Sequence, residues 1–227
     1  MGLETLNAGL DGMALIRSAL EASPGKVALV SSFGAESAVL LDMVASIDRT
    51  TPVVFLDTGR HFPETLDYQR ELCALLGLRH VQTAQPHARD LGRHDPNGQL
   101  HAEDADLCCH VRKTDPLSEA LDGFEGWITG RKRFQGGTRT RLMTVEPVPS
   151  TGQVKLNPLA HWTTEDIRNY RRLRQLPLHP LVNQGYPSIG CAPCTNPSEG
   201  EGSRAGRWSG MDKTECGIHL HVDGSGI

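Results

Sequence analysis

The sequence has no long apolar run, which argues against a membrane-spanning helix, since such a helix needs about 20 consecutive apolar residues. The opening residues 1–6 lack the basic region and apolar stretch of a signal peptide, and Leu6 is not the Ser or Thr of a myristoylation site. Basic residues are not in excess either: 23 Lys and Arg against 27 Asp and Glu give a net charge of −4. General binding to a phosphate backbone requires a basic face. We therefore expect a soluble, cytoplasmic protein with no nucleic acid or membrane partner.

Cysteine is also scarce. Six cysteines in 227 residues are far below the density of a disulfide scaffold, and without a secretion signal we expect them to be reduced. Reduced cysteines in such a chain are core residues, metal ligands or nucleophiles. The six are Cys73, Cys108, Cys109, Cys191, Cys194 and Cys216.

Strand-like and helix-like segments alternate over the first 150 residues or so, which predicts an α/β fold with an open, doubly wound parallel sheet. We expect strands over residues 26–30, 52–56, 79–83, 126–129 and 142–148. We expect helices over 4–21, 36–47, 63–76, 109–121 and 167–173, the last one capped near Thr163. The polar stretch 84–106 has no periodicity and predicts a surface excursion or a lid.

The last part of the chain differs in composition. After Pro177 it is dense in Gly, Pro, Ser and Cys and too poor in apolar residues to form a core of its own. We therefore expect an α/β domain over residues 1–180 and an irregular, Cys-rich segment over 181–227. This segment must be held by a metal or by packing on the main domain.

Two loops follow predicted strands. The loop Ser31, Ser32, Phe33, Gly34, Ala35, Glu36, Ser37 would present backbone N–H groups and a helix N-terminus to an anion. An ordinary capped turn is the alternative, because the loop lacks a Walker lysine and a GxGxxG pattern. The second loop is Leu56, Asp57, Thr58, Gly59, where Asp57 alone could equally be a turn residue. Because ligands bind beyond the carboxyl ends of parallel strands, the two loops together predict one crevice.

Four of the cysteines form two close pairs, Cys108 with Cys109 and Cys191 with Cys194. Adjacent cysteines rarely form a disulfide with each other, because the required geometry strains the intervening peptide. Four thiolates suit a zinc ion or an iron–sulfur cluster, and a tandem pair is unusual for tetrahedral zinc. Buried cysteines without a metal are the alternative. Cys73, at an apolar position in a predicted helix, is expected to be core.

Cys216 stands alone in a Gly-rich stretch that we expect to be exposed and mobile. Lys213 and His219 lie near it in sequence and would favour its thiolate, so Cys216 is a candidate nucleophile, and an incidental cysteine is the alternative. A basic series in Gly-rich settings suggests loops gathered around a small anionic ligand, against the alternative of solvated surface charge. This series comprises Arg112, Lys113, Arg131, Lys132, Arg133, Arg139, Arg141, Arg204 and Arg207.

From about residue 25 to 220 these motifs resemble the assimilatory sulfonucleotide reductases. The first two motifs alone would fit the wider adenine nucleotide α-hydrolase group, whose fold the resemblance implies. The more specific motifs are residues 186–195, 204–208 and 213–219, together with Cys108-Cys109 and Arg112-Lys113. Family members that reduce adenosine 5′-phosphosulfate carry this cysteine quartet and a [4Fe–4S] cluster, whereas members restricted to the 3′-phosphorylated nucleotide generally lack the quartet.

The resemblance implies thioredoxin-dependent reduction of adenosine 5′-phosphosulfate to sulfite and AMP in sulfate assimilation, through an S-sulfocysteine on Cys216. Reduction of the 3′-phosphorylated nucleotide, or of both, is the alternative. The implied cluster ligands are Cys108, Cys109, Cys191 and Cys194, in a cluster that carries no electrons. The loops 31–37 and 56–59 would hold the adenosine and ribose, and Lys113, Arg139, Arg204, Arg207 and His219 would face the phosphosulfate.

The loop from Gly130 to Arg139 departs from the family's more usual Arg-Arg-x-Gln-Ser pattern. Gly130 and Arg131 belong to the expected site, and among the arginines of this loop we favour Arg139 for the substrate contact. Two rival functions are an ATP pyrophosphatase-type adenylating enzyme and a zinc-stabilised binding module. A similar dithiol protein could replace thioredoxin, and the sequence leaves a homo-oligomer open.

Overall fold

The computed structural model describes residues 2–200, 204–211 and 213–219. Within these residues the chain forms a six-stranded sheet with the order β3-β2-β1-β4-β6-β5. Its strands are β1 Val27–Ser31, β2 Val53–Leu56, β3 Val81–Ala84, β4 Gly126–Ile128, β5 Val145–Val148 and β6 Gln153–Leu156. All neighbouring strands are parallel except β5 and β6, which form an antiparallel pair at one edge. The predicted doubly wound α/β sheet is confirmed, while β6 was missed and the strand expected over 142–148 is shorter.

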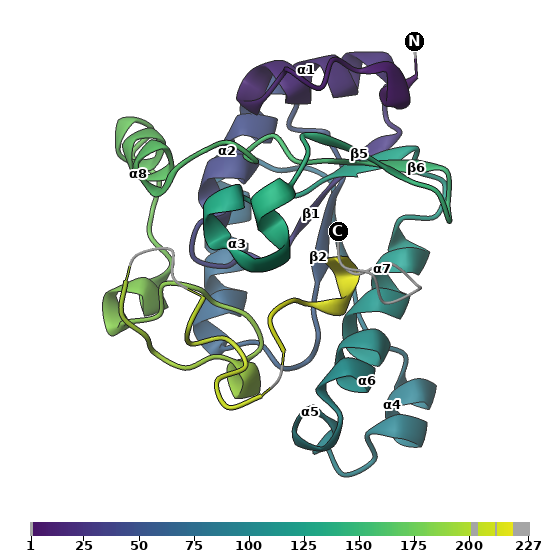
Figure 1. The fold of residues 1–227 in the computed structure, drawn as a ribbon, viewed down its shortest axis with the longest axis vertical. Helices are drawn as coiled ribbons and strands as arrows, with labels where there is room; N and C mark the ends of the chain where they lie inside the picture. The colour runs from purple at the N-terminus through teal and green to yellow at the C-terminus, as the bar shows by residue number, and fades with distance from the viewer. Residues whose placement is uncertain (1, 201–203, 212, 220–227) are drawn as a thin grey trace.

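Helices cover both faces of this sheet (Figure 1). They are α1 Gly12–Ala22, α2 Ser37–Ile47, α3 Pro63–Leu76, α4 Ala88–His94, α5 Leu100–Glu103, α6 Ala105–Cys109, α7 Asp115–Ala120 and α8 Thr164–Leu173. A π-helical turn, His110–Thr114, joins α6 to α7, so the helix expected over 109–121 begins earlier and is not regular. The expected helix over 4–21 is a 3₁₀ turn, Leu3–Thr5, followed by α1.

Alternation of side chains along the strands divides the core into two layers. Leu29 of β1 and Phe55 of β2 pack with α1, α2 and α3 on one face. Ala28 and Val54, which precede Leu29 and Phe55 in sequence, pack with Leu117 of α7 on the other face. Burial on both faces explains why β1 and β2 are continuous apolar runs.

The polar stretch 84–106 is more ordered than its composition suggests, because it contains α4 and α5. The buried carboxylate of Asp95 accepts a hydrogen bond from the Leu100 amide at 2.9 Å and forms an ion pair with Arg112 in the π-helical turn. Because Arg112 also donates a hydrogen bond to the Thr58 carbonyl, this ion pair holds the stretch 84–106 beside the loop 56–59.

The predicted helix ends are borne out at two places. Thr163 caps α8 by accepting a hydrogen bond from the Asp166 amide, and Gly77 ends α3 in the left-handed conformation, at φ +64°. No helix in the described part of the chain is long and apolar enough to cross a membrane.

The described residues after Pro177 contain only short 3₁₀ turns: Pro180–Gln184, Ala192–Cys194 and Gly217–His219. The last of these, yellow in Figure 1, packs against α6 and the π-helical turn. The Cys-rich segment therefore lies on the α/β unit, and a division of the chain at residue 180 stays a prediction.

Candidate active site

A cavity of about 210 Å³ opens beyond the carboxyl ends of β1, β2 and β4, where the sequence predicts a ligand crevice. Most of the predicted site residues line it. These are Ser31, Ser32, Gly34, Glu36, Ser37, Leu56, Thr58, Lys113, Gly130, Arg131, Arg139, Arg204 and Arg207, together with Cys191 and Cys216. Residues from six separate parts of the chain therefore meet at one pocket.

The loop after β1 is shaped by short hydrogen bonds at its two ends. Ser31 Oγ accepts a hydrogen bond from the Phe33 amide at 3.1 Å, and Ser37 Oγ donates one to the Gly34 carbonyl at 2.8 Å. Phe33 does not line the pocket: it has a positive φ of 49°, and its buried ring meets Phe55 edge-on at 5.2 Å. Its part is to anchor the loop in the core beneath.

The same loop touches the Cys-rich segment. A Cβ placed on Gly34 would lie 3.0 Å from the Ile189 carbonyl oxygen, so the two backbones approach too closely for a larger residue. Glu36 accepts a hydrogen bond from Lys132 Nζ at 2.8 Å across the pocket. Lys132 and Gln135 also line the cavity. From the sequence, Lys132 was named only as one of the basic residues around an anion, and Gln135 had no predicted role.

The loop after β2 contacts Cys191 and the π-helical turn. Thr58 Oγ1 lies 3.3 Å from Cys191 Sγ, and the Thr58 carbonyl accepts a hydrogen bond from Arg112 Nη1 at 2.8 Å. Asp57 does not line the cavity, and its carboxylate accepts hydrogen bonds from the Gly59 amide at 3.0 Å and from Gln85 at 2.8 Å. Gly59, at φ +66°, provides the turn and also does not line the pocket.

His61 lines the pocket and was missed at the sequence level. Its Nε2 lies 2.8 Å from the Leu56 carbonyl oxygen, and its ring stacks on Phe55 at 5.3 Å. Burial lowers the pKa of His61, which favours the neutral ring. His61 follows the turn residue Gly59 by two positions and belongs to no recognisable sequence motif, so the sequence alone gives it no role.

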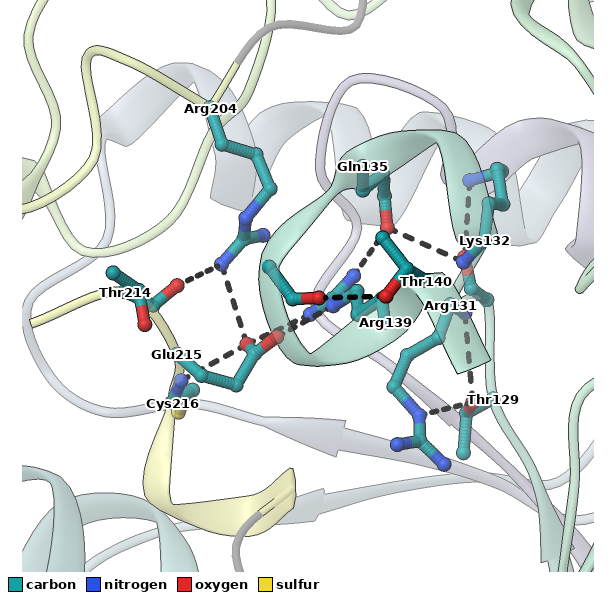
Figure 2. A network of polar contacts seen from close by, with 12 residues as sticks. Thr129, Arg131, Lys132, Gln135, Arg139, Thr140, Arg204, Thr214, Glu215 and Cys216 are labelled. Atoms are coloured by element: carbon teal, nitrogen blue, oxygen red, sulfur yellow. Dashed lines mark hydrogen bonds and ion pairs between the residues drawn. The ribbon is translucent and has the colours of Figure 1, made fainter. Parts of the chain in front are cut away.

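Cations gather at the end of the pocket that holds Cys216. Figure 2 shows Arg139 and Arg204 approaching the carboxylate of Glu215 from different sides. Arg139 donates from Nε at 2.5 Å and from Nη2 at 2.8 Å, and Arg204 donates from Nη2 at 3.2 Å. Burial, followed by the charge of Arg139, lowers the pKa of Arg204 to about 10, which leaves it protonated at neutral pH. Glu215 was part of a predicted motif but had no predicted role.

Arg131 has a different environment from Arg139. It is almost fully buried and forms an ion pair with Glu146 of β5, whose carboxylate also accepts a hydrogen bond from Asn157 at 3.1 Å. Its Nε lies 3.4 Å from Thr129 Oγ1, as Figure 2 shows. Arg131 thus lines the pocket while its charge is engaged with the edge of the sheet.

Cys216 is buried, which differs from the exposed position expected for it. It packs in one cluster with Cys109, Cys191, Cys194 and Trp208. A hydrogen bond from Cys109 and the charge of Lys113 lower the pKa of Cys216, whereas burial raises it. The charge of Lys113 favours the Cys216 thiolate whether or not Cys109 binds a metal, whereas the hydrogen bond requires a protonated Cys109. His219 ends the last 3₁₀ turn, and its side chain lies outside the described part of the structure.

The four paired cysteines are all buried, and none forms a disulfide. No three His, Cys, Asp or Glu side chains in the described ranges converge so as to hold a single metal ion. The surroundings nevertheless suit an anionic sulfur-rich group, because buried N–H donors there lack partners among the described residues: Arg112 Nε, Arg207 Nε and Trp208 Nε1. The four thiols as ligands, with these N–H groups as hydrogen-bond donors to sulfur, fit an iron–sulfur cluster held by four cysteines. Cys73, as predicted, packs half-buried against the main core.

Residues 26–197 match the phosphoadenosine phosphosulfate reductase domain family. The chain belongs to this family. An adenosine 5′-phosphosulfate reductase from Mesorhizobium japonicum is 52% identical over 96% of this chain and 86% of its own length. A phosphoadenosine 5′-phosphosulfate reductase from Gloeobacter violaceus is 39% identical over 91% of this chain and 87% of its own length.

Among solved structures, the phosphoadenylyl-sulfate reductase of Candida auris, a phosphate complex, superposes with a TM-score of 0.70. The Candida auris protein is 25% identical to this chain, and the match covers 86% of this chain and 94% of the Candida auris protein. The resemblance stated from the motifs is thereby confirmed, as is the fold that it implied.

Proposed function

We propose that the chain is a cytoplasmic adenosine 5′-phosphosulfate reductase of sulfate assimilation, which forms sulfite and AMP with electrons from thioredoxin or a similar dithiol protein. The observation that carries the proposal is that Cys216 lines the same pocket as Lys113, Arg139, Arg204 and Arg207. A nucleophilic thiol and a group of fixed cations are what transfer of a sulfuryl group from an adenylate requires. The name of the Mesorhizobium japonicum relative supports the same substrate.

Binding divides between the two ends of the pocket. The loops 31–37 and 56–59 would hold the adenosine and its ribose, because they lie at the carboxyl ends of β1 and β2. Lys113 and the arginines 139, 204 and 207 would hold the phosphosulfate group, with His219 as a further contact. The Lys132–Glu36 ion pair also lines the pocket and would limit the space open to the nucleotide.

The proposed reaction begins when the Cys216 thiolate attacks the sulfur of the phosphosulfate. A bond forms between Cys216 Sγ and that sulfur, and the bond from sulfur to the phosphate oxygen breaks. AMP leaves with the electron pair, stabilised by the fixed cations. A thiolate of the dithiol protein then attacks Cys216 Sγ, and sulfite leaves with the electron pair of the S–S bond. The second thiol of the donor resolves the mixed disulfide, so the donor supplies both electrons.

A [4Fe–4S] cluster would be held by Cys108, Cys109, Cys191 and Cys194. When bound, it would supply local charge and polarisability beside Lys113 and carry no electrons. Thr58 Oγ1 would orient the Cys191 sulfur, and the unpartnered N–H groups of Arg112, Arg207 and Trp208 would donate toward the sulfur-rich group.

Reduction of the 3′-phosphorylated nucleotide is the second candidate, because the relatives from Gloeobacter violaceus and Candida auris are named as reductases of it. An anaerobic assay of sulfite formation, with thioredoxin and each nucleotide in turn, separates the two. We expect faster turnover of the 5′-phosphosulfate, and a strong preference for the 3′-phosphorylated form would overturn this assignment.

The nucleophile is tested in the same assay with Cys216→Ser, from which we expect no sulfite. Cys73→Ser is the matched control, because Cys73 is a free cysteine outside the pocket. Sulfite formation that survives in Cys216→Ser would refute the role of Cys216. Absence of iron and sulfide from anaerobically purified protein would refute the cluster.

A further inference from the structure

The carboxylate of Glu215 lies where the proposed function requires the anionic group of the substrate. It is buried, it lines the pocket, and it accepts hydrogen bonds from both Arg139 and Arg204. Burial alone would raise the pKa of Glu215, but the hydrogen bonds and charge of Arg139 outweigh it and hold that pKa below its ordinary value. Glu215 is therefore a carboxylate at neutral pH.

These contacts use the guanidinium of Arg139 on every nitrogen. Nε and Nη2 donate to Glu215, and Nη1 donates to Gln135. A carboxylate and a phosphosulfate oxygen are the same kind of acceptor for a planar guanidinium. Because Glu215 occupies the bidentate Nε–Nη2 edge of Arg139, this edge can bind the phosphosulfate only as Glu215 gives up part of the contact.

The contact also constrains the nucleophile. The Cys216 amide donates a hydrogen bond to Glu215 Oε1 at 3.0 Å, and Arg204 Nη2 lies 3.3 Å from the Thr214 carbonyl oxygen. The same carboxylate thus connects the arginines to the backbone that carries Cys216, as Figure 2 shows. If Arg139 or Arg204 changes its contacts, Glu215 can transmit that change to the backbone of Cys216.

We propose that Glu215 is a positioning residue that occupies the arginine pair in the absence of substrate and exchanges with the phosphosulfate group when the nucleotide binds. The inference rests on the proposed function, because it takes Arg139 and Arg204 as phosphosulfate contacts. The exchange is favourable because the substrate brings two anionic groups to a site that holds one carboxylate. It also frees the Cys216 amide from Glu215, so the nucleophile adjusts only when substrate is present.

Nucleotide affinity tests the exchange directly. Adenosine, AMP and ADP are titrated calorimetrically into the wild-type protein and into Glu215→Gln, with ADP as an unreactive nucleotide that carries a second anionic group. We expect Glu215→Gln to bind AMP and ADP about tenfold more tightly, a change of about 1.4 kcal/mol, with the affinity for adenosine unchanged. Unchanged or weaker binding of AMP and ADP would overturn the proposal.

Glu119→Gln is the matched control, because Glu119 is an exposed carboxylate in an ion pair with His87 and does not line the pocket. We expect all three affinities of this control to equal those of the wild type. If Glu215→Gln does not fold, Glu215→Asp decides: its carboxylate is retracted by one methylene, and we expect it to bind ADP more tightly than wild type, while equal affinity would count against the exchange.

Kinetics separates positioning from a structural role. For Glu215→Gln we expect a lower KM for the sulfonucleotide together with a lower kcat, because the competitor is lost and Cys216 is less well held. A raised KM, with a lowered melting temperature, would indicate that Glu215 is only structural. Sulfite formation by the wild-type protein tests the proposed function itself. If the wild type forms sulfite but Glu215→Gln binds ADP with unaltered affinity, the exchange is refuted and the proposed function stands.

Discussion

Replacing Arg131 by methionine distinguishes a structural arginine from a substrate contact. Sequence alone placed Arg131 in the substrate site, and the structure puts its guanidinium in a buried ion pair with Glu146. Methionine keeps much of the volume and removes the charge. The variant then leaves the Glu146 carboxylate buried without its cation, beside the amide of Asn157 at 3.1 Å.

The expected cost is large, because breaking a buried pair by removing one partner destabilises a protein by about 3–5 kcal/mol. In a chain of this length 1 kcal/mol corresponds to about 2–4 °C in melting temperature, so we expect a fall of about 6–20 °C. Urea unfolding measures the same loss as a lower midpoint at an unchanged slope.

Two further variants sharpen the test. Arg131→Met combined with Glu146→Leu should recover most of the loss, since an apolar pair of similar volume commonly replaces a buried ion pair without cost. Arg70→Met removes an exposed arginine paired with Asp67 and should change stability by less than about 1 kcal/mol. A loss below about 1 kcal/mol in Arg131→Met, together with a raised KM for the nucleotide, would refute the structural assignment.

Three other outcomes follow from local geometry. Burial lowers the pKa of His179 to about 4, so between pH 6.5 and 4 the unfolded chain binds a proton that the folded ring does not, and stability falls as the pH is lowered, by up to about 1.4 kcal/mol per pH unit. Urea unfolding of wild type and His179→Gln across this range should show the steeper fall in the wild type, and equal slopes would contradict the assignment. Thr163→Ala should cost about 1 kcal/mol through loss of the α8 cap, whereas Thr163→Ser should cost little; an equal loss in both would count against capping. Gly34→Ala should weaken ADP binding about tenfold in calorimetry, because its Cβ would press on the Ile189 carbonyl, and Gly92→Ala, with open space around it, should leave ADP binding unchanged.

The sheet and its two ligand loops were predictable because their determinants are local. The strands β1 and β2 are short apolar runs, and the loops that follow them hold small and polar residues at the end of each run. Parallel pairing then brings both loops to the same edge of the sheet. Nothing more than sequence order and this rule is needed to place Ser32 and Thr58 on one pocket.

Strand β6 was missed because a lysine interrupts its apolar pattern. Lys155 is buried, with its amine 5.4 Å from the centroid of the Trp127 ring, and burial lowers its pKa to about 8. A lysine normally marks an exposed position. The Trp127 ring that lies beside Lys155 comes from a distant part of the sequence, and a short sequence window does not contain it.

The missed parts of the site have the same cause. Asp95 orders the 84–106 excursion through Arg112, which lies 17 positions away, and Glu215 contacts Arg139 across 76 positions. Each of these side chains is ordinary in its own sequence neighbourhood. Their roles arise when folding removes them from water, because a buried charge has to find a partner of opposite sign.

The position of Glu215 next to Cys216 has a consequence for the second half of the proposed reaction. In the proposed reaction a protein dithiol would not reach Cys216 while it is buried, so the segment 213–219 would have to move away from the pocket. In the proposed mechanism the S-sulfocysteine left after AMP departs would carry a new sulfonate in the pocket that the same arginines line, and this anion would compete with the Glu215 carboxylate for them. The contact that holds the segment is therefore weakest in the intermediate that must meet the donor. It is restored when sulfite has left and Cys216 is again a thiolate.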